Sequence, residues 1–178
     1  MKRPAEAHYE QSEPSRITSD CEKPRGFVQT LFSRVLHSYF LMSRGLTLGV
    51  RAIVRAPDGK FLLVRHTYTA GWHFPGGGVE KGETIVAALS KELLQETGLQ
   101  ISGTPHLHGV FHNGHVSKRD HVLVYICDAE GQLPKKHRSH EIAEIAYFAL
   151  RELPESIDPG TMRRIREIVD GEAVSEAW

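Results

Sequence analysis

One amphipathic helix is expected in the middle of a chain otherwise rich in short strand-like runs, and this feature constrains the fold most. Ile85, Leu89 and Leu93 recur four positions apart within residues 84–97, the spacing of a single buried helical face. Gly98 follows at the position where many helices end in a left-handed residue. The pattern therefore predicts a helix over 84–97 that is buried on one side.

Strand-like runs flank this helix on both sides. Before it, residues 46–54 alternate, APDGK (56–60) predicts a turn, and residues 61–66 are expected to return as the second strand of a hairpin. After it come three further strand-like runs and a closing helix, at 106–112, 121–127, 145–150 and about 161–169. This order predicts a single mixed α/β domain with no internal repeat.

The ends of the chain differ from this domain in composition. Residues 1–25 are rich in Pro, Ser, Glu and Lys with almost no large apolar residue, so we expect a disordered tail. Residues 26–44 have apolar residues at helical spacing and predict an amphipathic helix, which could dock on the domain, lie on a membrane surface or form a homodimer contact. An interaction protein that uses this helix stays open. Residues 171–178 are expected to form a C-terminal tail.

Charge and cysteine content narrow the class of protein. Lys+Arg and Asp+Glu both number 22, so the formal net charge of +0 gives no strong signal for nucleic acid or an anionic membrane. The two cysteines are far apart and indicate a reducing compartment. No apolar run approaches the roughly 18–20 residues of a transmembrane helix. We therefore expect a cytoplasmic protein without a transmembrane segment.

A glycine-rich loop and a cluster of helix carboxylates stand next to each other in sequence. Glu92 and Glu96 are one helical turn apart, and Gln95 joins that face three positions after Glu92. Such carboxylates are most often a solvated helix surface. The preceding loop, 75–78, changes this interpretation because its glycines let the backbone approach a ligand. The combination suits a divalent cation that bridges to phosphate oxygens.

The same stretch resembles the signature of the Nudix hydrolase family. Gly77, five residues, Glu83, seven residues and then KELLQETGL (91–99) follow the family pattern, and FPGG (74–77) is a typical lead-in. The resemblance implies an α/β/α sandwich with a central mixed sheet over about 45–170. It also implies hydrolysis of a diphosphate linkage in a small nucleoside diphosphate derivative with Mg²⁺ or Mn²⁺.

The resemblance assigns metal ligands and shows one departure. Glu92 and Glu96 match the family's metal ligands, and Gly76 matches a position whose carbonyl often joins them. Gln95 stands where the family has a further Glu that is usually also a metal ligand. Its amide oxygen could still bind the metal, but the ligand shell has one negative charge fewer and is expected to bind its ions more weakly, or to bind fewer of them. A nucleotide-binding sensor module with weak or no turnover is therefore the alternative function.

The remaining catalytic assignments concern the loops on either side of the helix. Glu83 matches the loop carboxylate that the family pairs with an Arg, and Lys91 takes the place of that Arg without its planar fork. The general base is open among the helix carboxylates and a later one, Glu141 or Glu144. Both of these could equally be exposed charges beside a strand.

Four residues are candidates for substrate binding. Arg65, at a strand end, could meet a phosphate or simply lie exposed. Trp72 could stack on a base or pack the loop. Gly77 and Gly78 could let a ligand approach the backbone. A zinc site among the histidines of 106–121 is a weaker interpretation, and the sequence does not select one nucleotide substrate.

Overall fold

The computed structural model describes residues 36, 39, 45–129, 134 and 141–178. The chain divides into two units, 1–43 and 44–178, and the second unit is the α/β domain. The predicted tail, most of the helix at 26–44 and the homodimer contact assigned to it lie outside the described residues. Leu36 and Tyr39, the two residues described there, are helical and exposed.

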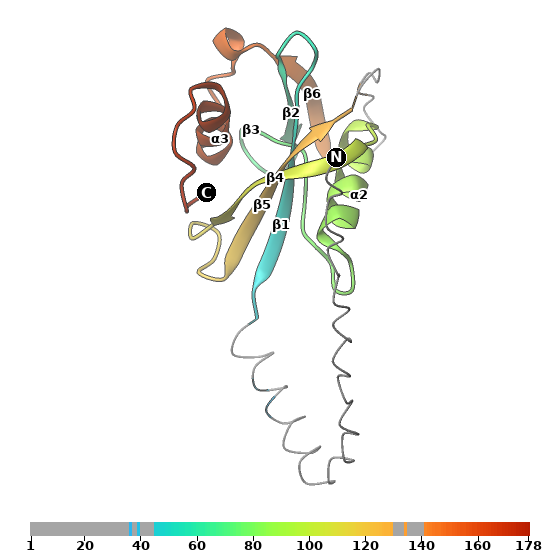
Figure 1. The fold of residues 1–178 in the computed structure, drawn as a ribbon, viewed down its shortest axis with the longest axis vertical. Helices are drawn as coiled ribbons and strands as arrows, with labels where there is room; N and C mark the ends of the chain where they lie inside the picture. The colour runs from blue at the N-terminus through green and yellow to red at the C-terminus, as the bar shows by residue number, and fades with distance from the viewer. Residues whose placement is uncertain (1–35, 37–38, 40–44, 130–133, 135–140) are drawn as a thin grey trace, which may run out of the picture. The chain divides into compact units, whose positions relative to one another are not determined.

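Two three-stranded sheets form the centre of the domain (Figure 1). In the first, the strand order is β1-β5-β4, with β1 parallel to β5 and β4 antiparallel to it: β1 (Thr47–Val54), β4 (Ser102–His112) and β5 (Asp120–Asp128). In the second, all pairs are antiparallel in the order β3-β2-β6: β2 (Phe61–His66), β3 (Trp72–His73) and β6 (Ile142–Phe148). Helices α2 (Ile85–Thr97) and α3 (Pro159–Val169) lie on opposite sides of the strands, and a short 3-10 helix, η1 (Leu150–Glu152), follows β6. The α/β sandwich expected for the domain is therefore present, with one mixed sheet.

The predicted hairpin is wrong beyond its turn. Residues 56–60 do form the turn, with Ala56 N donating to Lys60 O at 2.9 Å, and Arg55 pairs with Phe61 directly after it. Beyond that pair β1 joins β5 and β2 joins β6, in different sheets. The last part of β1 is buried throughout, so it can lie inside a sheet and pair with a distant strand.

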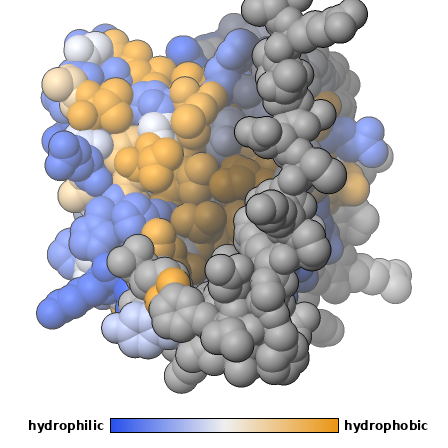
Figure 2. Space-filling view, turned by 60° about the horizontal axis from the view of Figure 1, so that its bottom comes forward, coloured by the Kyte–Doolittle hydropathy of each residue, from blue (hydrophilic) through white to orange (hydrophobic). Residues whose placement is uncertain are grey.

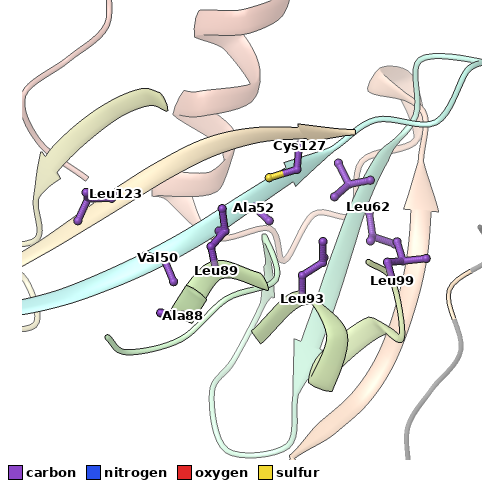
Figure 3. Packing of buried hydrophobic residues seen from close by; sticks show 10 residues of the cluster. Val50, Ala52, Leu62, Ala88, Leu89, Leu93, Leu99, Leu123 and Cys127 are labelled. Carbon is purple, nitrogen blue, oxygen red and sulfur yellow. The ribbon is translucent and has the colours of Figure 1, made fainter. Parts of the chain in front are cut away.

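The core on the α2 side forms because one face of α2 is apolar (Figure 3). Leu89 and Leu93 are fully buried against Val50, Ala52 and other strand residues. The helix begins where the Thr84 side chain accepts from Ala87 N at 3.2 Å, and it ends at Gly98, whose φ is 73°. Each fully buried leucine contributes about 1.5–3 kcal/mol. This packing fixes the rotation of α2 and therefore the direction of its polar face.

A second core lies on the α3 side. Ile165 of α3 packs with a set of large apolar residues from both sheets, which includes Ile53, Phe61, Leu63, Phe111 and Val124. The helix begins two residues earlier than expected, because Asp158 caps it by accepting from Thr161 N at 2.8 Å and Pro159 occupies its first turn. The two cores use alternate side chains of the same strands, as a sheet covered on both faces requires.

Residues 171–178, predicted as a tail, pack against the domain. His112 N donates to Glu176 O at 2.8 Å, and Trp178 N donates to His112 O at 3.0 Å. The indole of Trp178 lies edge-on to Phe111, with the ring centroids 6.2 Å apart. The end of the described chain is therefore part of the folded unit.

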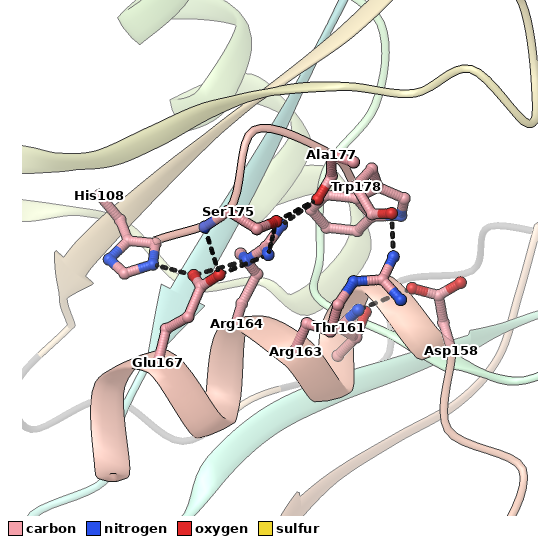
Figure 4. Close-up of polar contacts among 9 residues, drawn as sticks. All are labelled: His108, Asp158, Thr161, Arg163, Arg164, Glu167, Ser175, Ala177 and Trp178. Atoms are coloured by element: carbon pink, nitrogen blue, oxygen red, sulfur yellow. Dashed lines mark hydrogen bonds and ion pairs between the residues drawn. The ribbon is translucent and has the colours of Figure 1, made fainter. Parts of the chain in front are cut away.

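A buried ionic network ties α3 to this segment (Figure 4). Arg164 is fully buried, donates to both carboxylate oxygens of Glu167, and lies over the Phe111 ring at 3.7 Å. Glu167 also accepts from Ser175 N at 3.0 Å and lies 2.8 Å from His108 Nε2. Burial acts to raise the pKa of Glu167, but Arg164, Ser175 and His108 together hold it below its ordinary value. The network compensates the charges that the fold has removed from water.

Apolar side chains also reach the surface. On the face shown in Figure 2, hydrophobic residues gather beside a hydrophilic margin. Exposed apolar side chains include Leu46, Tyr68, Leu107, Val110 and Val116. Among the helices of the described chain, none has the length and apolar character needed to cross a membrane.

Candidate active site

The glycine-rich loop runs antiparallel along the outer side of β1. Val50 N donates to Gly77 O at 2.9 Å and Ala52 N donates to Pro75 O at 2.8 Å. This register turns the amide and carbonyl of Gly76 away from β1. Gly76 has a φ of 146°, and a Cβ there would overlap the carbonyl oxygen of Val50. Glycine is therefore required where the loop passes closest to the strand.

The next two glycines differ in their surroundings. A Cβ on Gly77 would lie 2.6 Å from the carboxylate of Glu92, whereas one on Gly78 would meet nothing within 4 Å. Gly77 thus makes room for a helix carboxylate to lie against the loop backbone. Of the two glycines predicted to bind substrate, the structure places Gly77 directly against a helix carboxylate and Gly78 in open space.

The carboxylates of Glu92 and Glu96 both face the glycine loop. Glu96 Oε2 accepts from Gly76 N at 2.8 Å, and the Glu96 side chain is only 10% exposed. Burial raises the pKa of Glu96 to about 7, against the opposing effects of the Gly76 amide and the Arg51 guanidinium. Burial also raises the pKa of Glu92 above its ordinary value, while Lys91 and Arg51 act to lower it. The two helix residues therefore form a partly dehydrated pair whose charges repel each other.

His66 is a site residue that the sequence reasoning missed. Its Nε2 lies 3.5 Å from Glu96 Oε1, and its buried Nδ1 has no hydrogen-bond partner among the described residues. Burial, together with the charges of Arg51 and His73, lowers the pKa of His66 to about 4. The alternation of side chains along β2 could have indicated this position. His66 lies four residues after Leu62, so both side chains point to the same face of the strand, and Leu62 packs on the α2 side.

Arg51 is the second residue that was missed. Its Nη1 donates to the carbonyl of Gly76 at 2.5 Å and to that of Phe74 at 3.3 Å. Its positive charge acts to lower the pKa of Glu92, Glu96 and His66. The sequence signal was a single charged residue in the otherwise apolar second half of β1, a position that requires polar partners nearby.

Lys91 and Glu83, expected as a pair from the family resemblance, lie together in the structure. Lys91 Nζ is 3.1 Å from Glu83 Oε2, 3.3 Å from Glu80 Oε1 and 3.7 Å from Glu92 Oε1. The hydrogen bond from the Glu80 amide holds the pKa of Glu83 below its ordinary value, and Lys91 makes a smaller contribution in the same direction. The lysine thus joins the loop to the helix next to the Glu92 carboxylate.

Gln95 and Glu141 lie farther from the centre of this arrangement. Gln95 is exposed on α2. Glu141 lies just before β6, where its carbonyl accepts from Thr67 N at 2.8 Å. The charge of Glu141 acts to raise the pKa of Glu96.

Two predicted substrate-binding residues have other contacts. Arg65 Nη2 lies 2.6 Å from Glu144 Oε1 on the neighbouring strand β6. Trp72 is 8% exposed and packs edge-on against Phe148, with ring centroids 4.8 Å apart, in the core on the α3 side. This burial favours the loop-packing alternative for Trp72 over stacking on a base, because a buried indole offers little of its face to a ligand.

The donor set is that of a hard divalent cation. Glu92 and Glu96 place carboxylate oxygens against the loop that carries the Gly76 carbonyl, and burial raises the pKa of both carboxyls. Within the described ranges, no three His, Cys, Asp or Glu side chains are already arranged to hold an ion, which also leaves the zinc interpretation without support there. Oxygen donors of this kind suit a hard divalent cation, although in this structure the Gly76 carbonyl is bonded to Arg51.

Comparison with known proteins gives a family for this arrangement. A family model described as "NUDIX domain" matches residues 45–168. A MutT-like protein of Streptomyces ambofaciens is 26% identical over 125 residues, which cover 70% of this chain and 78% of that protein. An ADP-ribose pyrophosphatase of Methanocaldococcus jannaschii is 34% identical over 102 residues, 54% of this chain and 59% of that protein. An RNA pyrophosphohydrolase of Halorhodospira halophila is 44% identical over 57 residues, 32% of each chain.

Solved structures agree on the fold. A MutT NUDIX hydrolase of Burkholderia pseudomallei superposes with a TM-score of 0.60 at 22% identity, over 69% of this chain and 98% of that one. The matched region contains the glycine loop, α2 and both sheets. The chain therefore belongs to the Nudix hydrolase family.

Proposed function

We propose that the protein is a Mg²⁺- or Mn²⁺-dependent pyrophosphohydrolase that cleaves a diphosphate linkage in a nucleoside diphosphate derivative. Its relatives carry the names ADP-ribose pyrophosphatase, RNA pyrophosphohydrolase and m7GpppN-mRNA hydrolase. The substrates in these three names all contain a nucleotide, and they differ in the rest of the molecule. The proposal therefore names the linkage and leaves the second group open.

The observation that carries the proposal is the carboxylate pair against the glycine loop, in which Glu96 is buried and Glu92 is partly buried. Glu96 has a pKa raised to about 7, and Glu92 is shifted in the same direction, both chiefly by burial. Like charges held together away from water oppose ionisation until a cation compensates them. A divalent ion bound there would polarise the phosphoryl group and lower the pKa of a bound water.

The chain's own residues supply orientation and charge. The Gly76 amide holds Glu96 in place, and Lys91 lies beside Glu92 while it is paired with Glu83. The Arg51 guanidinium is bonded to the glycine loop, and its charge acts on both helix carboxylates, so a phosphate entering the site would meet a cation already present.

Glu141 remains our candidate for the general base. It is the carboxylate outside α2 whose charge reaches Glu96, and it is exposed, so water can approach it. Glu144, the other candidate, is engaged with Arg65.

The second candidate function is a nucleotide-binding module with little turnover. Two observations favour it: Gln95 carries no charge, and Arg51 occupies the Gly76 carbonyl that a metal would need. Such a module would bind nucleotides in the presence of Mg²⁺ without releasing product.

The test is a panel of nucleoside diphosphate derivatives, nucleoside triphosphates, dinucleotides and capped RNA with Mg²⁺ or Mn²⁺, read as released phosphate after phosphatase treatment. Glu96→Gln should abolish release and weaken Mn²⁺ binding in calorimetry. The matched control Glu155→Gln changes an exposed glutamate and should behave as wild type. Binding of a nucleotide without release from any compound would favour the sensor function, whereas equal release by Glu96→Gln and wild type would refute the assigned site.

A further inference from the structure

Both backbone polar groups of Gly76 are bonded within the chain. The Gly76 amide donates to Glu96 Oε2 at 2.8 Å, and the Gly76 carbonyl accepts from Arg51 Nη1 at 2.5 Å. The same Nη1 also donates to the Phe74 carbonyl at 3.3 Å. The Arg51 guanidinium therefore holds the backbone oxygen that lies beside the carboxylate pair and that a hard divalent cation would use as a ligand.

Arg51 also supplies positive charge to the carboxylate pair. Its charge acts to lower the pKa of Glu92 and of Glu96, in opposition to the burial that raises both. A divalent ion bound at the pair would supply positive charge to the same carboxylates and would use the same Gly76 oxygen. Because two cations at one oxygen repel each other, the guanidinium and the ion would compete for this position.

The Arg51 side chain has room to leave the Gly76 carbonyl. Its neighbours Val50 and Ala52 are buried in the core on the α2 side, so the alternation of β1 directs Arg51 to the opposite face. On that face Arg51 lines a cavity of about 490 Å³, whose wall also contains Asp158. The guanidinium can therefore move away from the glycine loop without any change in the buried core.

We propose that Arg51 is a built-in competitor of the metal ion, which holds the Gly76 carbonyl beside the carboxylate pair and is displaced when a divalent cation binds there. The proposal rests on the proposed function for the presence of a metal site at Glu92 and Glu96. It adds a residue of the site that weakens metal binding. A residue that only anchored the glycine loop would have the opposite effect, because its loss would disorder the site and weaken metal binding.

The experiment measures binding of Mg²⁺ and Mn²⁺ to the full chain by calorimetry at pH 8, above the pKa of about 7 of Glu96. Arg51→Met removes both the charge and the donor, so it should bind each ion about 10- to 100-fold more tightly than wild type. Arg51→Gln keeps a donor for the Gly76 carbonyl and should lie between the two. Arg51→Lys keeps the charge and should remain close to wild type.

The matched control is Arg55→Gln. It removes a positive charge directly after β1, where the Arg55 guanidinium lies over the Phe61 ring, 5.3 Å from the centroid. This variant should bind both ions as wild type does. Unchanged metal binding by Arg51→Met would overturn the proposal, and weaker binding would make Arg51 an anchor of the glycine loop instead.

Melting temperatures give a second readout that does not depend on the calorimetry. In EDTA, Arg51→Met should melt at a lower temperature than wild type, because the carboxylate pair has lost a nearby cation. Saturating Mg²⁺ should then raise its melting temperature by more than it raises that of wild type. An equal rise in the two proteins would overturn the competition. If Arg51→Met is unfolded in EDTA, Arg51→Gln serves for the same comparison.

The outcomes separate this proposal from the function itself. Hydrolysis of a nucleotide by wild type, together with unchanged metal affinity in Arg51→Met, would overturn the competition and leave the function standing. Tighter metal binding by Arg51→Met in a chain that hydrolyses no nucleotide would support the competition and contradict the function. If neither wild type nor any variant bound Mg²⁺ or Mn²⁺, both would fall, because Glu92 and Glu96 would then form no metal site.

Discussion

Glu96 and His66 have pKa values shifted in opposite directions, so the two residues should affect the pH dependence of stability in opposite ways. Glu96 has a pKa raised from 4.5 to about 7, so the folded protein keeps a proton that the unfolded chain has released. Its contribution to stability is present below pH 4.5 and is lost as pH rises to 7. His66 has a pKa lowered from 6.5 to about 4, so the unfolded chain holds a proton that the folded protein lacks. Its contribution is present above pH 6.5 and is lost as pH falls to 4.

Between pH 4.5 and 6.5 these two effects have equal size and opposite sign. Each shift spans about 2.5 pH units, and integration over this window gives a change of about 2 kcal/mol in the free energy of unfolding for each group. The wild-type contributions cancel. In the folded state Glu96 and His66 together hold one proton across the window, and the cancellation is the same whichever of them carries it.

Single substitutions should uncover each contribution. In Glu96→Gln only the His66 contribution to the pH dependence remains. Relative to wild type, the free energy of unfolding of this variant should therefore rise by about 2 kcal/mol from pH 4.5 to 6.5. In His66→Gln only the Glu96 contribution remains, so the free energy of unfolding relative to wild type should fall by the same amount over this range. The measurement is urea unfolding at both pH values in EDTA, followed by circular dichroism, with wild-type values subtracted. If both variants run parallel to wild type, burial does not perturb these groups and the reasoning fails.

Other contacts lead to three further predictions. Glu167→Gln leaves a buried guanidinium without its counter-charge and should lower the free energy of unfolding by about 3–5 kcal/mol in urea; an unchanged midpoint would contradict this. Gly77→Ala places a Cβ against the Glu92 carboxylate and should weaken Mn²⁺ binding in calorimetry, whereas Gly78→Ala should not, and equal binding by both would refute the assigned geometry. Gln95→Glu should destabilise the metal-free protein by about 0.2–0.5 kcal/mol per like-charge pair and raise its melting temperature with Mn²⁺. An unchanged response to metal would place Gln95 outside the ligand shell.

Local patterns in the sequence predicted most of the elements. The four-residue spacing of Leu89 and Leu93 placed α2, and Gly98 ended it in the left-handed conformation expected. The runs at 61–66 and 121–127 lie within observed strands. These features depend on neighbouring residues along the chain, so a single sequence carries them.

Features that depend on distant contacts escaped prediction. The partner of β1 is β5, far along the chain, with Thr47 opposite Asp120, and nothing in the local alternation specifies that pairing. Arg51 and His66 belong to strands whose pattern predicts core. The role of Arg51 depends on the glycine loop that passes beside it, and the role of His66 depends on α2, which carries Glu96. Trp72 was ambiguous because an indole beside a loop can pack inward or outward, and only the position of Phe148 decides it.

The segment at 176–178 also affects how the molecule meets other chains. β4 is the outermost strand of its sheet, and such a strand presents unpaired amides and carbonyls to which a foreign strand can add. Its pairing with β5 is irregular between Ser102 and His106 and again between Leu107 and Gly109. Such bulges bend the strand, so its edge is less suited to pairing with another strand. At the C-terminal end of β4, the His112 amide donates to the Glu176 carbonyl and the His112 carbonyl accepts from the Trp178 amide. The segment whose Trp178 packs against Phe111 therefore also covers the His112 end of the β4 edge and leaves less of it open to a foreign strand.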